Sequence, residues 1–121
     1  MSKNFQRMDK MGAMIMSRFE DLKLEVHQVG QDMLFLLTGG KSHIGAATTA
    51  YLTDGVVHVH TSSVPGHKEY TLTAELARKA ASALGTTVTV IMGIHYDHLG
   101  MDDIEEIAWR TAELMNGYLM N

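Results

Sequence analysis

Two short loops of this sequence combine glycine, histidine and lysine, residue types that can hold a phosphorylated ligand. The first is Thr38-Gly39-Gly40-Lys41-Ser42-His43, and the second is Pro65-Gly66-His67-Lys68. Glycines let backbone N–H groups approach an anion, and the neighbouring lysine supplies positive charge. The spacing is not that of a Walker loop, which has a longer glycine-rich stretch before its lysine. Ordinary glycine turns with solvated side chains explain either loop alone, but the recurrence favours an anion site.

A third cluster, Gly93-Ile94-His95-Tyr96-Asp97-His98, follows the last β-rich run of the chain. Its imidazole, phenol and carboxylate groups could relay protons, hydrogen-bond a heteroaromatic ring, or bind a metal ion through Asp97. Loops at strand ends are where binding residues concentrate. The alternative is that His95 and Asp97 brace the loop or cap the last helix.

Two more histidines, His58 and His60, alternate on one predicted strand and therefore point the same way. They could provide two ligands of a metal site, with His27 on the first strand as a third. A half-exposed sheet surface is the competing interpretation. Ser62 and Ser63 lack the context of a nucleophile elbow, so a serine hydrolase is not indicated.

The composition indicates one soluble domain: the chain has 121 residues, 45% of them apolar. It contains no cysteine, which excludes disulfides, thiolate metal sites and cysteine nucleophiles and fits a cytoplasmic location. The formal net charge is −4 and the basic residues are scattered, which argues against nucleic-acid binding. No stretch approaches the roughly 20 apolar residues of a membrane helix.

The hydrophobic pattern predicts five strands and two helices. Strands are expected from Phe19 to about His27, Met33 to Leu37, Ile44 to Leu52, Val56 to Thr61 and Thr86 to Ile94. The run Met33 to Leu37 is wholly apolar, as in a strand covered on both faces. The sequence Asp54-Gly55 signals a two-residue hairpin, which places Tyr51 opposite His58 and Thr49 opposite His60 on one polar face.

Helical spacing begins near Tyr70 and stops at Gly85, a natural C-cap. Its apolar stripe consists of Leu72, Leu76, Ala80, Ala83 and Leu84. A last helix follows Gly100, with acids in its first turns and one face formed by Ile104, Ile107, Ala108, Thr111, Met115 and Tyr118.

The resulting order, β-β-β-β-α-β-α, predicts an α+β fold with a mainly antiparallel sheet and helices on one face. Residues 18–121 make up this single domain. Residues 1–17 are rich in methionine and are interpreted as a tail or a short docking helix.

Three motifs in this order, Thr38 to Gly45, Pro65 to Glu69 and Gly93 to Asp97, resemble the LpdD-type family of small D subunits associated with gallate and related hydroxyarylic-acid decarboxylases. The resemblance spans about Phe19 to Leu119. It implies a non-catalytic, homodimeric chaperone with a fold similar to proteasome assembly chaperones. Such a chaperone receives prenylated FMN made by a flavin prenyltransferase and delivers it to a UbiD-type decarboxylase.

The chemistry of the three loops agrees with this implication. The expected cofactor-binding residues, for prenylated FMN or FMN itself, are Gly39, Gly40, Lys41, His43, Gly66, His67, Lys68, His95, Tyr96 and Asp97. Two other functions remain open: a small metal-dependent hydrolase or decarboxylase using His58 and His60 with Asp97 or His95, and a protein-assembly factor that binds no cofactor.

Overall fold

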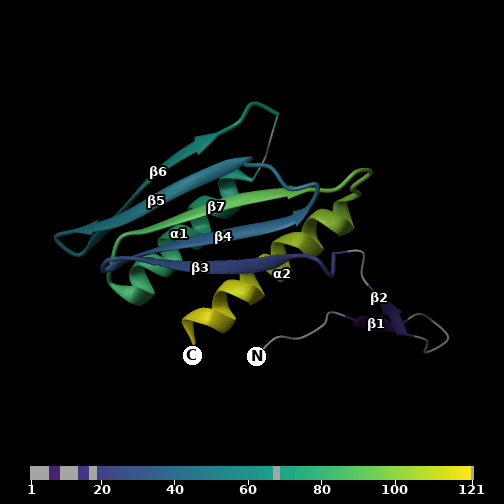
Figure 1. Ribbon diagram of the computed structural model, residues 1–121, viewed down its shortest axis with the longest axis horizontal. Coiled ribbons are helices and arrows are strands. Elements are labelled where there is room, and N and C mark those ends of the chain that lie inside the picture. The colour runs from purple at the N-terminus through teal and green to yellow at the C-terminus, as the bar shows by residue number, and fades with distance from the viewer. Residues whose placement is uncertain (1–5, 9–13, 17–18, 67–68, 121) are drawn as a thin grey trace.

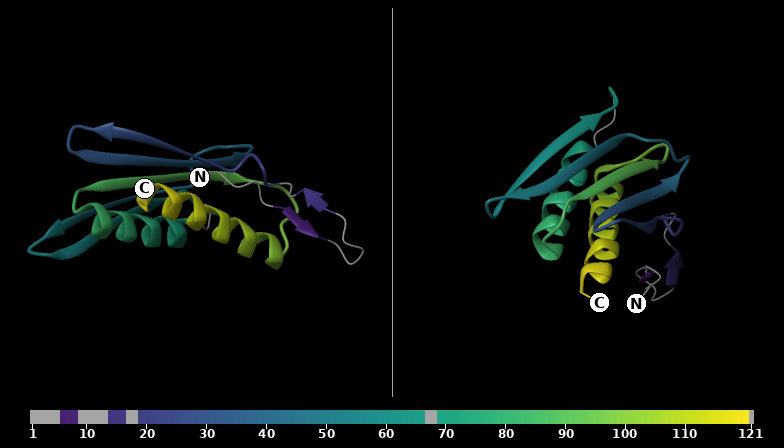
Figure 2. Two further views of the ribbon diagram at one scale, coloured as in Figure 1. Left: turned by 90° about the horizontal axis from the view of Figure 1, so that it is seen from below. Right: turned by 60° about the vertical axis from the view of Figure 1, so that its left-hand side comes forward.

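One five-stranded sheet organises the protein, and two helices cover one of its faces (Figures 1 and 2). The computed structural model describes residues 6–8, 14–16, 19–66 and 69–120. The elements of the domain are β3 (Lys23–Val29), β4 (Asp32–Gly40), β5 (Ala46–Thr53), β6 (Val56–Ser63), α1 (Tyr70–Leu84), β7 (Val88–His95) and α2 (Met101–Leu119). The predicted α+β class and the element order are confirmed.

The N-terminal segment contributes two short strands, β1 (Gln6–Met8) and β2 (Met14–Met16). They pair antiparallel with each other in a separate two-stranded sheet. The helical interpretation is therefore wrong for these six residues, while a docking role for residues 1–17 stays a prediction. The remaining residues of that range lie outside the described part of the chain.

The hairpin between β5 and β6 has the predicted register. Thr53 lies opposite Val56, and Tyr51 lies opposite His58. Asp54 and Gly55 have φ angles of 53° and 77°, the left-handed pair that a two-residue hairpin turn requires. The local turn signal was thus sufficient to place the polar residues of both strands on one face.

The position of β7 determines which loops meet at one end of the sheet. The strand order is β3-β4-β7-β5-β6, so β7 lies between two strands that follow each other in the chain. It pairs parallel with β4 and antiparallel with β5. The sheet is accordingly mixed, with one parallel pair among otherwise antiparallel ones.

The core lies between the sheet and the helices. Its largest fully buried side chains include Phe35 and Leu37 of β4, Val88, Val90 and Met92 of β7, and Met115 of α2. The helix α1 presents small residues to this layer, because Ala77, Ala80 and Ala81 are completely buried. Small side chains let the helix axis come close to the sheet.

Two details of the predicted burial are corrected. Helices cover only one face of β4, so Leu34 and Leu36 on the other face are half-buried rather than enclosed on both sides. The buried stripe of α1 passes through Ala77 and Ala81, which leaves Ala83 and Leu84 exposed before the Gly85 cap. Both errors came from patterns that do not show which neighbours cover a residue.

No helix in the described part of the chain is long and apolar enough to span a membrane.

Candidate functional site

The first and third predicted loops meet at one end of the sheet. Gly40 is in register with His95, and the backbone N–H of Lys41 donates to the His95 carbonyl at 3.0 Å. Asp97 then connects the two loops through side chains. Its Oδ2 lies 3.4 Å from Lys41 Nζ, and its Oδ1 lies 3.3 Å from His95 Nε2. The His43 ring completes the group, since its centroid is 5.3 Å from that of His95.

The insertion of β7 explains why these loops converge. The connection from β4 to β5 must pass over the end of β7, and residues 41–45 do so. A side chain at Gly93 would come within 2.5 Å of the His43 carbonyl oxygen, so the glycine allows this crossing. The Gly45 N–H donates to the Met92 carbonyl at 3.0 Å and fixes the crossing segment to the strand.

The second predicted loop approaches the third across a cavity of about 480 Å³. Pro65 and Gly66 line it on one side, and His95 and Tyr96 belong to the same lining. Most of the remaining wall is apolar and comes from both helices, β7 and the loop between β7 and α2: Leu72, Met92, Ile94, Leu99, Ile104 and Ile107. His67 and Lys68 lie outside the described residues, although the neighbouring Gly66 and Glu69 line this cavity.

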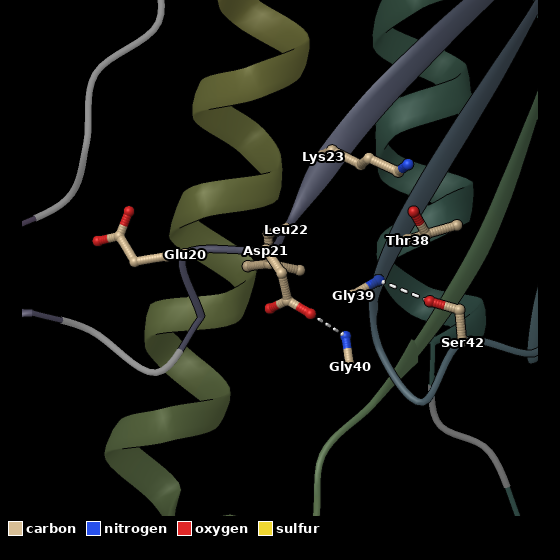
Figure 3. Close-up of a pocket in the computed structure, with 8 residues that line it drawn as sticks. All are labelled: Glu20, Asp21, Leu22, Lys23, Thr38, Gly39, Gly40 and Ser42. Atoms are coloured by element: carbon tan, nitrogen blue, oxygen red, sulfur yellow. Dashed lines mark hydrogen bonds between the residues drawn. The ribbon is translucent and has the colours of Figure 1, made fainter.

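The backbone N–H groups of Gly39, Gly40 and Lys41 were expected to be available to an anion, but they donate to protein acceptors instead. A second cavity beside these residues is lined by Glu20, Asp21, Leu22, Lys23, Thr38, Gly39, Gly40 and Ser42 (Figure 3). The Gly39 N–H donates to Ser42 Oγ at 3.1 Å, and the Gly40 N–H donates to Asp21 Oδ2 at 2.7 Å. With Lys41 N–H bonded to His95, all three backbone donors have protein acceptors.

Asp21 is a residue of this site that the sequence interpretation missed. Besides Gly40, it accepts a hydrogen bond of 2.5 Å from the Tyr96 hydroxyl, so one carboxylate joins the first and third loops. The Tyr96 ring also packs edge-to-face on Phe19, with centroids 4.8 Å apart. Asp21 stands just before β3 and 19 residues from Gly40, and no local pattern marks such a partner.

The pKa values of Asp21 and Asp97, the two acidic residues that join the loops, are both depressed. Burial acts to raise the pKa of Asp21, but the hydrogen bonds from Tyr96 and the Gly40 N–H outweigh it, and the pKa falls below its ordinary value of 3.8. The positive charge of Lys41 and hydrogen bonds from Lys41 and His95 lower the pKa of the exposed Asp97. Both carboxylates are therefore ionised at neutral pH.

Acidification is expected to loosen the contact between the loops. The pKa of Asp21 is lower in the folded protein than in the unfolded chain, where it is near 3.8, so ionised Asp21 stabilises the fold above that pH. This stability is lost as the pH falls below 3.8 and Asp21 becomes protonated. Urea unfolding midpoints measured from pH 7 to pH 2 check this, with Asp21→Asn as the comparison. The difference in urea midpoint between wild type and Asp21→Asn should shrink below pH 4. A difference that stays constant with pH would contradict the depressed pKa of Asp21.

The polar face on β5 and β6 lies toward the other end of the sheet. His58 and His60 both stack on Tyr51, at centroid distances of 5.3 and 5.8 Å, and Tyr51 Oη is 3.4 Å from His60 Nε2. His60 is in register with Thr49 and hence Thr89, six residues before His95 on β7. His27 is on β3, at the opposite edge of the sheet. Among the described residues, no three His, Asp or Glu side chains are grouped to hold a metal ion.

Comparison with known families gives one assignment. A family model described as prenylated flavin chaperone LpdD-like domain matches residues 17–121. Among curated proteins, no match to the chain is found.

Proposed function

This chain belongs to the family of prenylated flavin chaperone LpdD-like domains, and from that membership we propose that it binds prenylated FMN without catalysing a reaction and delivers it to a UbiD-type decarboxylase. Prenylated FMN has a dianionic phosphate at one end and a largely apolar, extended ring system at the other. A chaperone for it needs a cation for the phosphate and an apolar cavity with a few polar groups for the ring.

The observation that carries the proposal is the cavity of about 480 Å³ at the end of the sheet where the three loops approach one another. Its volume lies within the range of roughly 300–1,000 Å³ seen for small-molecule sites. Leu72 and Ile107 from the two helices and Met92 from β7 give it apolar walls, which suit an aromatic ring. His95 and Tyr96 add polar groups to the lining.

Lys41 is connected to this cavity through Asp97, which contacts both Lys41 and the lining residue His95. Its side chain is 82% exposed and can reorient toward a ligand phosphate. The Gly39 and Gly40 N–H groups already have protein acceptors, so these glycines support the site by close packing rather than as ready-made anion donors. A side chain at Gly39 would come within 2.6 Å of Leu22 and of the Tyr96 hydroxyl.

Flavin titration tests the binding directly. Purified protein mixed with prenylated FMN, and separately with FMN, should bind the prenylated form at micromolar concentrations. We expect Lys41→Ala to weaken binding by about 1.5–3 kcal/mol, as for a hydrogen bond to a charged group. Lys79→Ala, which removes an exposed lysine from α1, is the matched control and should bind like wild type. Absence of flavin binding by the wild type would refute the proposal, and unchanged affinity of Lys41→Ala would remove Lys41 from the site.

Delivery needs its own experiment. The cofactor source is a flavin prenyltransferase, and the client is an apo decarboxylase of the UbiD type. Cofactor bound to this chaperone should activate the apo decarboxylase faster than the same concentration of free cofactor. Equal rates would leave binding intact and exclude delivery. If the chaperone instead bound the decarboxylase equally well with and without flavin and held no flavin itself, it would be an assembly factor.

We also propose that the protein is a homodimer, as the resemblance to proteasome assembly chaperones implies, and that it is cytoplasmic, which fits its lack of cysteine. The sheet face without helices supports a partner there, because Leu34 and Leu36 of β4 and Ile91 of β7 are only half-buried on it. Light scattering during size-exclusion chromatography should give twice the chain mass of 13.4 kDa.

The metal-enzyme alternative predicts a stoichiometric transition metal that survives dialysis, which elemental analysis detects.

A further inference from the structure

We propose that Glu69 sets the orientation of the flavin ring in the cavity by accepting a hydrogen bond from the imide N–H of the ring's pyrimidine edge. The inference rests on the proposed flavin binding and goes beyond it, because it assigns one edge of the ligand to one side chain. Glu69 lies directly before α1, at the helix N-cap position, and it lines the cavity.

The placement of the Glu69 carboxylate depends on Gly45. A Cβ atom at Gly45 would overlap the Glu69 carboxylate, so the carboxylate occupies the space that a side chain at position 45 would take. Gly45 is itself held by two backbone hydrogen bonds, from its N–H to the Met92 carbonyl at 3.0 Å and from the Val64 N–H to its carbonyl at 2.9 Å. The carboxylate therefore packs against backbone that is anchored to β7, and its Oε2 atom is buried.

The chemistry of the cavity gives this carboxylate a specific use. Among the described residues that line the cavity, Glu69 is the one acid, and six of its neighbours there are Leu, Ile or Met. An ionised carboxylate is an acceptor only, and a charged acceptor forms stronger hydrogen bonds than a neutral one. A flavin ring offers one N–H between two carbonyl groups on its pyrimidine edge, whereas the opposite, prenyl-bearing part is apolar. Pairing the imide with Glu69 leaves that apolar part for the hydrophobic wall.

The affinity of prenylated FMN for a small set of variants tests the assignment. Glu69→Leu should weaken binding about 10- to 100-fold, the loss expected for a hydrogen bond to a charged group. Glu69→Gln keeps an acceptor oxygen and should lose less, about 3- to 10-fold. Glu75→Gln removes the same charge from an exposed position of α1 and should bind like wild type.

Gly45→Ala adds a test that keeps the acid in the protein. The new methyl group would push the Glu69 side chain out of its place, and the end of a flexible side chain can move without disturbing the fold. Binding should weaken as in Glu69→Leu while the thermal unfolding midpoint stays close to that of wild type. Retention of full affinity in both variants would overturn the inference.

A spectroscopic measurement separates a direct contact from a structural role. The imide N–H of bound prenylated FMN should ionise at higher pH in wild type than in Glu69→Gln, because a neighbouring carboxylate disfavours a second negative charge. Ionisation at the same pH in both proteins would overturn the inference and leave flavin binding intact. Failure of the wild type to bind any flavin would instead refute the proposed function. If Glu69→Leu does not fold, Glu69→Gln and the ionisation measurement decide the question.

Discussion

Replacing Arg110 by alanine is expected to lower the free energy of unfolding by about 3–5 kcal/mol, the cost of breaking a buried ion pair. Arg110 is only 8% exposed, and among the described residues it donates to Glu106, Phe19 and Glu20. Its Nε bonds Glu106 at 3.1 Å, its Nη1 bonds the Phe19 carbonyl at 3.3 Å, and its Nη2 reaches Glu20 at 3.5 Å. One side chain of α2 therefore holds the segment that leads to Asp21. Its loss leaves the buried Glu106 carboxylate without this cation.

Urea unfolding at pH 7 measures the effect, and two further proteins control it. Arg78→Ala removes an exposed arginine of α1 and should change the unfolding free energy by less than about 0.5 kcal/mol. The double variant Arg110→Met with Glu106→Leu replaces both charges by apolar groups and should recover most of the stability. If Arg110→Ala lost no more stability than Arg78→Ala, the ion pair would contribute nothing to the fold.

Gly40→Ala is expected to destabilise the protein by about 2–5 kcal/mol, the sum of left-handed backbone strain and a steric clash. Gly40 has a φ of +65°, and a Cβ atom there would overlap the carbonyl oxygen of His95. That oxygen belongs to backbone and accepts the Lys41 N–H, so it cannot move without separating the two loops. Flavin binding should weaken together with stability, because His95 and Tyr96 line the cavity.

Gly30→Ala is the matched control for this substitution. Gly30 has nearly the same φ, +61°, but nothing lies within 4 Å of the position its Cβ would take. The control therefore isolates backbone strain, about 1–2 kcal/mol, from the clash with His95. Both unfolding free energies come from urea titrations. Equal losses in the two variants would show that the loops tolerate separation at Gly40.

The elements of this fold were largely predictable because their signals are local. Asp54-Gly55 set the β5–β6 register, and Gly85 ended α1 in the left-handed conformation expected of a C-cap, with φ 67°. The acids at the start of α2 also behave as expected, since the Asp103 carboxylate accepts the N–H of Gly100 at 2.9 Å. Each of these features depends on residues within four positions of one another.

Strand order was not predictable in the same way. No local pattern shows that β7 inserts between β4 and β5, because the insertion depends on pairing between residues far apart in the chain, such as Gly40 with His95. The wholly apolar Met33 to Leu37 run suggested two covered faces, yet helices cover only one. Ile104 was predicted to share one apolar helix face with Ile107, yet Ile104 is 53% exposed at the wall of the cavity whereas Ile107 is buried.

Part of the candidate site was likewise predictable from local motifs, and part was not. The three motifs predicted which loops form the site, and the structure brings Lys41, His43, His95 and Asp97 together as one group. Binding by these residues stays a prediction, as it does for His67 and Lys68. Asp21 and Glu69 were not among the expected site residues. Their importance comes from contacts with Gly40 and Gly45, at sequence separations of 19 and 24 residues, which only the fold creates.

The late position of β7 in the chain has a consequence for biosynthesis. The cavity draws residues from β7 and from α2 up to Ile107, so the proposed cofactor site is incomplete in a nascent chain until Ile107 has emerged from the ribosome. A cofactor that binds only the completed sheet stabilises the whole domain rather than a single loop. Loading should therefore slow amide hydrogen exchange across all five strands, and cells short of cofactor should degrade this protein faster.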